Sequence, residues 1–227
     1  MSVEIVSNVD SVPRTRQTRV VVFDFDGVIL ESADIKTDAF VDLFSHRPEH
    51  LEAIRRHHLS NLGVSRFKKF EWIHRELLGV PYTRETESQL GAAFANLVLE
   101  KVLAAPFVEG AEEALTSLGR VAKLFVASGT PEEELQHIVE RRGLRHHFLG
   151  VRGSPNEKTT VIEEALSATG VSREELVFVG DGESDLRAAK ATGVRFIARD
   201  TPTLHDFWVQ SKVSLIQDLR PLPAMLA

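Results

Sequence analysis

The chain has 227 residues, of which 43% are hydrophobic and 26% are charged, and it contains no cysteine. This length and composition fit a globular protein with a substantial core, and they exclude disulfides and thiolate chemistry. The net charge of −6 gives no sign of a basic face, so we expect no nucleic acid as a partner.

The N-terminal segment is polar with scattered charges and has no continuous apolar stretch of the kind found in signal peptides. Elsewhere no apolar run approaches the roughly 20 residues that span a bilayer. The lack of cysteine fits a reducing compartment. We therefore expect a cytoplasmic protein without a membrane partner, in which residues 1–18 form an N-terminal extension.

Short apolar runs along the chain predict the strands of a buried sheet. Their apolarity is continuous rather than alternating, which is typical of parallel strands that are covered on both faces. The runs lie at residues 20–23, 124–127, 148–151, 176–179, 194–197 and 213–216.

Helical patterns separate the later strands. Residues 131–142 begin with proline and three glutamates, a favourable helix start, and stop before a glycine. Residues 158–169 carry apolar side chains at helical spacing, and residues 185–192 are rich in alanine; both segments are followed by glycine. Strands and helices that alternate in this way predict a doubly wound, mainly parallel α/β sheet.

Between residues 33 and 105 this alternation stops. Only helical patterns occur there, at residues 34–44, 48–59, 66–78 and 84–103. An all-helical insert after the first strand predicts a second, smaller domain. We therefore expect an α/β core made of residues 19–32 and 106–227, and a helical domain made of residues 33–105.

Polar residues directly follow three of the predicted strands. Asp24 and Asp26 follow the first strand, Ser128 follows the second, and Asp181 and Asp185 follow the strand at residues 176–179. In open α/β sheets, ligands bind outside the carboxyl ends of the strands. Carboxylates and a hydroxyl brought together at this edge predict a site for a hard cation and a phosphate group.

The sequence VFDFDGV at residues 22–28 resembles the first motif of the haloacid dehalogenase-like hydrolase superfamily. In that family the first aspartate is a nucleophile that forms an aspartyl-phosphate, which implies this role for Asp24. The second is the general acid and base and binds Mg²⁺ through its backbone carbonyl, which implies these roles for Asp26. Dehalogenases usually lack this second acid, so phosphoryl chemistry is favoured. The plain alternative is a strand that ends in turn-forming aspartates.

Two further segments resemble the phosphate-binding motifs of the same family. Ser128 and Gly129 match the hydroxyl and the backbone N–H that hold the phosphoryl group, although Thr130 in this segment is also a good helix N-cap. Lys158, in the sequence GSPNEK, matches the lysine that neutralises the phosphate oxygens. The Lys-Pro-x-Pro form of many members is absent here, and a solvated lysine in the first turn of a helix is the alternative.

The sequence GDGESD at residues 180–185 resembles the motif that completes the Mg²⁺ site of the family. The resemblance implies that Asp181 binds the ion directly and that Asp185 either binds it through water or positions Lys158. Two acids that cap a short helix are the alternative. The implied metal ligands are Asp24, Asp26, Asp181 and Asp185, and Mg²⁺ suits such oxygen ligands.

The helical insert resembles the cap of the group that contains phosphoglycolate phosphatases and β-phosphoglucomutases. In that group the cap closes over the core, excludes water and supplies specificity residues. The sequence GVSR at residues 63–66 resembles a cap loop whose arginine contacts the distal part of the substrate. Arg66 is thus a candidate substrate-binding residue, and an exposed arginine at a helix start is the alternative.

Three lysines and a histidine pair near these motifs have other interpretations. Phosphonoacetaldehyde hydrolases use a cap lysine as a Schiff base, which keeps Lys68 and Lys69 as candidates, although the arginine argues against that chemistry. Lys36 follows the first connection to the insert and could approach the site, but we interpret it as a solvated lysine. His57 and His58 are adjacent, so on a helix they point in different directions and make poor joint metal ligands.

The resemblance implies Mg²⁺-dependent hydrolysis of a small phosphate monoester through an aspartyl-phosphate on Asp24, with Asp26 as general acid and base. A phosphomutase that uses the same intermediate is an alternative, because the sequence does not show whether water or a hydroxyl accepts the phosphoryl group. A non-catalytic binding module is the other alternative. We expect a small phosphorylated metabolite as partner and a monomer or homodimer.

Overall fold

The computed structural model of the protein describes residues 17–226. Most of the predicted N-terminal extension therefore lies outside the described residues. Thr18, its last residue, is buried, and its hydroxyl accepts a hydrogen bond from Arg195 at 3.2 Å. The chain is thus packed against the sheet one residue before the predicted boundary.

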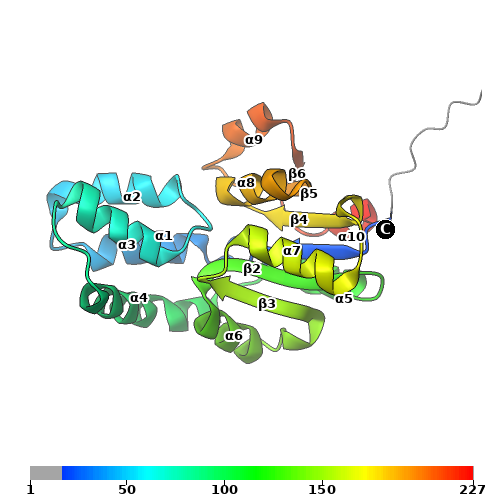
Figure 1. Cartoon of the computed structure of the whole chain (residues 1–227), viewed down its shortest axis with the longest axis horizontal. Coiled ribbons are helices and arrows are strands. Elements are labelled where there is room, and N and C mark those ends of the chain that lie inside the picture. Colours follow the sequence, from blue (N-terminus) through cyan, green and yellow to red (C-terminus); the bar gives the residue numbers. More distant parts are fainter. Residues whose placement is uncertain (1–16, 227) are drawn as a thin grey trace, which may run out of the picture.

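A parallel sheet of six strands forms the centre of the larger part of the molecule, in the order β3-β2-β1-β4-β5-β6 (Figure 1). Every neighbouring pair in it is parallel. The prediction of a doubly wound α/β fold is therefore confirmed. The strands are β1 (Val20–Phe23), β2 (Lys123–Pro131), β3 (Phe148–Ser154), β4 (Leu176–Gly180), β5 (Arg195–Arg199) and β6 (Ser214–Ile216).

Strand β1 shows why its apolar run is continuous. Val21 and Phe23 belong to the core cluster that includes residues of α5 (Ala111–Leu118), α6 (Glu132–Arg141) and α10 (Leu222–Leu226). Val20 and Val22 point to the opposite face, toward α7 (Lys158–Thr169) and α8 (Glu183–Thr192). Helix α9 (His205–Ser211) packs beside β5 through Trp208, which is fully buried. Helices on both faces leave β1 no solvent-facing side.

The helical insert lies beyond one end of the sheet, at the left of Figure 1. Phe40, Phe70 and Phe94 form its centre, with ring centroids 4.8–5.8 Å apart. The predicted helix at 66–78 is α3 continued by a π-helical turn (Ile73–Leu77), and a 3-10 turn (Pro48–His50) precedes α2. The insert contains α1 (Ala33–Leu43), α2 (Leu51–Leu59), α3 (Arg66–Trp72) and α4 (Arg84–Ala104).

The two connections between the insert and the sheet run side by side. The backbone N–H of Glu31 donates to the carbonyl of Pro106 at 3.0 Å, and that of Val108 donates to Ile29 at 3.0 Å. These two hydrogen bonds join the chain before the insert to the chain after it. The division into residues 19–32 and 106–227 on one side and 33–105 on the other stays a prediction that this arrangement supports.

Three helices were not predicted: α5, α9 and α10. Each has eight residues or fewer, which is too short for a helical period to stand out in the sequence. The helix that was predicted to start at Pro131 starts one residue later: Pro131 is the last residue of β2, and α6 begins at Glu132. In residues 17–226, no helix is long and apolar enough to cross a bilayer.

Candidate active site

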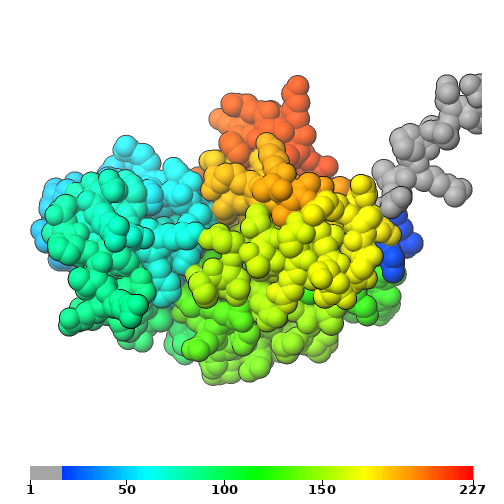
Figure 2. All heavy atoms as spheres, in the orientation of Figure 1, coloured from blue at the N-terminus to red at the C-terminus, as the bar shows by residue number. Residues whose placement is uncertain are grey.

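The carboxyl ends of three adjacent strands, β2, β1 and β4, meet at the edge of the sheet that faces the insert. The chain runs from β1 outward to β3 and then returns to the other side of β1 with β4. A ligand crevice is expected where the strand order reverses in this way. Figure 2 shows the insert, in cyan and teal, packed against this edge.

Asp24 lies directly after β1 and is only 2% exposed. Its Oδ1 accepts a hydrogen bond from the backbone N–H of Phe25 at 2.7 Å, and its Oδ2 accepts one from Lys158 at 2.9 Å. The pKa of Asp24 is raised to about 7, because burial and the carboxylate of Asp185 together outweigh the opposite effect of Lys158. The site therefore holds a carboxylate whose negative charge is incompletely compensated.

Lys158, in the first turn of α7, joins Asp24 to Asp185. Its ammonium group is buried and donates to a carboxylate oxygen of each residue. The second oxygen of Asp185 accepts from the backbone N–H of Gly182 at 2.9 Å, which fixes the loop after β4. Burial lowers the pKa of Lys158, but the two carboxylates outweigh burial and raise it above its usual value. The alternative of a solvated Lys158 is therefore wrong.

Asp24, Asp181 and Asp185 form a compact group of buried acids. Each offers a carboxylate oxygen, and the three oxygens lie within 4.8 Å of one another. Burial raises the pKa of Asp181 well above its usual value, and repulsion from the other two carboxylates raises it further. Crowded oxygen ligands without enough positive charge fit a hard divalent cation such as Mg²⁺.

The carboxylate of Asp26 turns away from this acid group and toward hydroxyl and ammonium donors. Its Oδ1 accepts from Ser32 at 2.7 Å, and its Oδ2 accepts from Thr130 at 2.9 Å and from Lys36. Burial raises the pKa of Asp26, but Lys36 and the hydroxyl groups outweigh it and hold the pKa below its usual value. Asp26 is thus kept as a carboxylate in the ligand-free site.

The structure contradicts the interpretation of Lys36 as solvated and the alternative interpretation of Thr130 as a helix N-cap. Lys36 is not a solvated lysine: its side chain is 15% exposed and contacts both Asp26 and Thr130. Thr130 is not a helix N-cap, because it lies within β2 and donates to Asp26. Both residues reach Asp26 from other elements, so no local pattern in the sequence could show the contacts.

Ser128 and Gly129 lie near the end of β2 that faces the insert. The Oγ of Ser128 accepts from the backbone N–H of Thr130 at 3.1 Å. A Cβ at Gly129 would lie 2.5 Å from the carbonyl oxygen of Gly63, in the loop between α2 and α3. Only glycine at position 129 therefore allows this loop to approach the strand end so closely.

Arg66 is buried rather than exposed, with 5% of its surface accessible. Its guanidinium group makes two hydrogen bonds to the carboxylate of Glu134 on α6, at 2.6 and 3.0 Å, and lies 4.5 Å from the ring centre of Phe94. The alternative of an exposed helix-start arginine is thus wrong. In this structure the fork of Arg66 ties the insert to α6.

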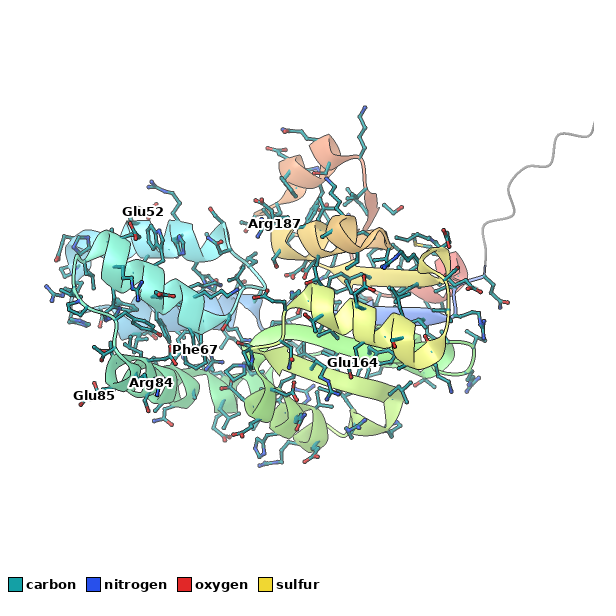
Figure 3. All side chains as sticks on the ribbon, viewed as in Figure 1. Glu52, Phe67, Arg84, Glu85, Glu164 and Arg187 are labelled. Carbon is teal, nitrogen blue, oxygen red and sulfur yellow. The ribbon has the colours of Figure 1, made fainter. Side chains whose placement is uncertain are left out.

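Most of the predicted site residues, from both parts of the molecule, line one cavity of about 50 Å³; they are Asp24, Asp26, Arg66, Ser128, Gly129 and Asp181. Lys158 lines the groove described next, and Asp185 lies behind Lys158 and lines neither. This wider groove of about 620 Å³ runs beside the cavity, between the insert and the α/β part. Phe67 lines the groove from α3 and Arg187 from α8; both are labelled in Figure 3. Ser128 and Gly129 border the cavity and the groove, so the groove leads to this strand end.

The chain matches the haloacid dehalogenase-like hydrolase family over residues 21–199, which include every strand end of the site. It belongs to this hydrolase family. Among its relatives is phosphoglycolate phosphatase 1 of Pseudomonas aeruginosa, with 26% identity over 198 residues that cover 81% of this chain and 70% of the relative. Together the family and this relative place the protein among the phosphatases.

Solved structures of the family share the fold. CbbY of Rhodobacter sphaeroides, in complex with phosphate, has a TM-score of 0.71 and 18% identity, covering 90% of this chain and 96% of that one. A predicted phosphoglycolate phosphatase of Haemophilus somnus 129pt has a TM-score of 0.70 and 16% identity, covering 93% and 99%. At such low identity these similarities concern the fold alone.

Proposed function

We propose that this hydrolase cleaves a small phosphate monoester, with Asp24 as the nucleophile and a divalent cation, Mg²⁺, as cofactor. The observation that carries the proposal is the environment of Asp24: a buried carboxylate at a strand end, bonded to Lys158 and adjacent to two further acids. Such a carboxylate can split one difficult displacement at phosphorus into two easier ones.

In the first step an oxygen of Asp24 attacks phosphorus while the bond from phosphorus to the ester oxygen breaks, and Asp26 gives that oxygen a proton. The dianionic phosphate that enters beside Asp26 raises the proton affinity of this carboxylate, as like charges do, so Asp26 takes up the proton from solvent before the step begins. In the second step water attacks the aspartyl-phosphate, Asp26 takes a proton from the water, and inorganic phosphate leaves Asp24.

Residues on the neighbouring loops hold the phosphoryl group in this scheme. Ser128 and the backbone N–H of Gly129 bind its oxygens, and Lys158 neutralises their charge. Asp24, Asp181 and Asp185 with the backbone carbonyl of Asp26 would hold Mg²⁺, which, when bound, neutralises negative charge on the phosphate. The helical insert acts as a cap that excludes water from the cavity.

The relative from Pseudomonas aeruginosa suggests phosphoglycolate as the first ester to test. Phosphate release from a panel of monoesters would be measured with Mg²⁺ and with EDTA, for wild type and Asp24→Asn. We expect Mg²⁺-dependent release in the wild type and a loss of at least about 10³-fold in Asp24→Asn, because the nucleophile is removed.

Asp206→Asn is the matched control, because Asp206 is exposed on α9, outside the candidate site. It should keep wild-type activity. Turnover that persists in Asp24→Asn, with amide hydrolysis and contaminating phosphatase excluded, would refute the mechanism. Transfer to a second hydroxyl of the substrate without phosphate release would favour the phosphomutase, and binding without turnover would favour the non-catalytic module.

A further inference from the structure

Two buried residues of the insert line the reaction cavity but have no part in the proposed chemistry. Lys69, on α3, and His58, at the end of α2, are each 3% exposed. Both border the cavity that also contains Asp24 and Ser128. Polar side chains buried this deeply normally have partners that satisfy their charge and hydrogen bonds.

Lys69 differs from the other cations around this cavity in having no carboxylate partner. Lys36 pairs with Asp26, Arg66 pairs with Glu134, and Lys158 contacts two acids. Among residues 17–226, the hydrogen bond that Lys69 makes runs from its Nζ to Nδ1 of His58, at 3.1 Å, and no ion pair involves it. A neutral ring nitrogen does not balance a buried ammonium charge.

His58 has an unsatisfied donor of its own. Since its Nδ1 accepts from Lys69, the neutral ring carries its proton on Nε2. Burial lowers the pKa of His58 far below its usual value, and Lys69 lowers it further, so the ring stays neutral. The Nε2 atom is buried without a hydrogen-bond partner in the described structure. Lys69 and His58 therefore bring a positive charge without an acidic partner, and an N–H without an acceptor, to the wall of the cavity.

We infer that Lys69 and His58 form a subsite for a second oxyanion of the substrate, at the end opposite the phosphate that is cleaved. The inference rests on the proposed function and narrows it to esters that carry a carboxylate or a second phosphate. An oxyanion offers the missing counter-charge to Lys69 and an acceptor to Nε2 of His58. Both deficits of the pair are met by the same group.

The contacts of Arg66 support this assignment. Its two terminal nitrogens already bind Glu134. The residue that the sequence singled out for the distal part of the substrate is therefore engaged in this closed arrangement, whereas Lys69, one helical turn along α3, has no acid partner. The small cavity of about 50 Å³ also favours a compact substrate.

Binding of unreactive phosphonates to the full chain with Mg²⁺ tests the subsite without relying on turnover. The probes are phosphonoacetate, with a carboxylate, ethane-1,2-bisphosphonate, with a second phosphonate, and ethylphosphonate, with neither. Calorimetry should show that wild type binds at least one of the first two more tightly than ethylphosphonate. The tighter of the two identifies whether the second oxyanion is a carboxylate or a phosphate.

The variants Lys69→Met and His58→Phe remove the two donors separately. Lys69→Met should weaken the binding of the preferred probe with two anionic groups by about 10- to 100-fold, the scale of a hydrogen bond to a charged group. Its binding of ethylphosphonate should be unchanged. His58→Phe should weaken the binding of the preferred probe by about 2- to 10-fold. Lys101→Met is the control, because Lys101 is exposed in the last turn of α4, and it should bind all probes like wild type.

An equal loss for all three probes in Lys69→Met, or no loss for any, would overturn the subsite. Lys69→Gln, which keeps a polar side chain, serves as the second variant, and thermal unfolding of each protein verifies that it is folded. Phosphate release is measured separately. If wild type hydrolyses no ester, the proposed function fails, while the phosphonate affinities still decide whether the subsite exists.

Discussion

Lys69 has an electrostatic environment that costs the folded protein free energy. Burial, the largest cause, and the charges of Lys36, Lys158 and Arg66 together lower its pKa to about 7, and Asp26 acts in the opposite direction. Its hydrogen bond to the neutral ring of His58 does not remove the charge. A buried ammonium group that destabilises the fold in this way is expected where a ligand supplies the missing negative charge.

The cost predicts a pH-dependent gain in stability for Lys69→Met. In the unfolded chain Lys69 has a pKa near 10.5, so below pH 7 both states carry the proton and the folded state bears the full penalty, about 1.4 kcal/mol for each unit of difference. Between pH 7 and 10.5 only the unfolded chain keeps the proton, so the penalty shrinks as pH rises.

Urea unfolding of ligand-free protein checks this. Lys69→Met should raise the free energy of unfolding by about 2 kcal/mol or more near pH 6, and by clearly less near pH 9.5. The exposed Lys101→Met should show no such trend. A stability difference that is the same at both pH values would mean that Lys69 is not a buried cation without an acidic partner.

At the scale of elements, the loop between α2 and α3 brings the backbone of the insert closest to Lys158 and the end of β2. Gly63 in this loop has φ +75°, and a Cβ there would lie 2.5 Å from both Nζ of Lys158 and Oγ of Ser184. Gly79, before α4, has a similar φ of +64° but no atom within 4 Å of its Cβ position. The two positions share the backbone conformation and differ in their neighbours.

Because of this difference, the same substitution should have different effects on activity at Gly63 and at Gly79. Gly63→Ala and Gly79→Ala should each lower the free energy of unfolding by about 1–2 kcal/mol, because alanine disfavours a positive φ. Only Gly63→Ala should also lower kcat/KM, by about 10-fold or more, since its methyl group displaces Lys158 or opens the insert. Equal activities of the two variants would show that the loop does not need to lie this close to Lys158.

At the scale of the whole molecule, we expect the acid group at the strand ends to couple metal binding to folding. Asp24, Asp181 and Asp185 come from two loops that only the folded sheet brings within 4.8 Å. A cation that binds this arrangement and not the unfolded chain stabilises the fold by about 2.7 kcal/mol at 100 times its Kd. Thermal unfolding with Mg²⁺ and with EDTA measures the effect.

We expect Mg²⁺ to raise the Tm of wild type, and Asp181→Asn to lose most of this rise because it lacks one ligand. In EDTA the same variant should be at least as stable as wild type, since burial and its acidic neighbours raise the pKa of Asp181. Asp206→Asn should respond like wild type. A full Mg²⁺ response in Asp181→Asn would place the ion elsewhere.

The strands and most helices could be predicted because their signals are local. Continuous apolar runs gave five core strands and, more weakly, β3, and the helix predicted at residues 158–169 has the bounds of α7. The acids of the candidate site could be found because they directly follow strands, and parallel strands end at one edge of a sheet. Ser128 and Lys158 were found through their order along the chain relative to the first motif.

The partners of the cations could not be predicted. Lys36 reaches Thr130 across 94 positions, and Arg66 reaches Glu134 across 68. Whether a lysine is solvated, paired or buried without a counter-charge depends on how the insert lies on the sheet, and no periodic pattern encodes that. The sequence by itself determined the sheet and its acidic edge, because neighbouring residues set both. Only the tertiary structure decided that Lys69 and His58 face the cavity without an acid, since packing between distant segments sets the charge balance of a buried site.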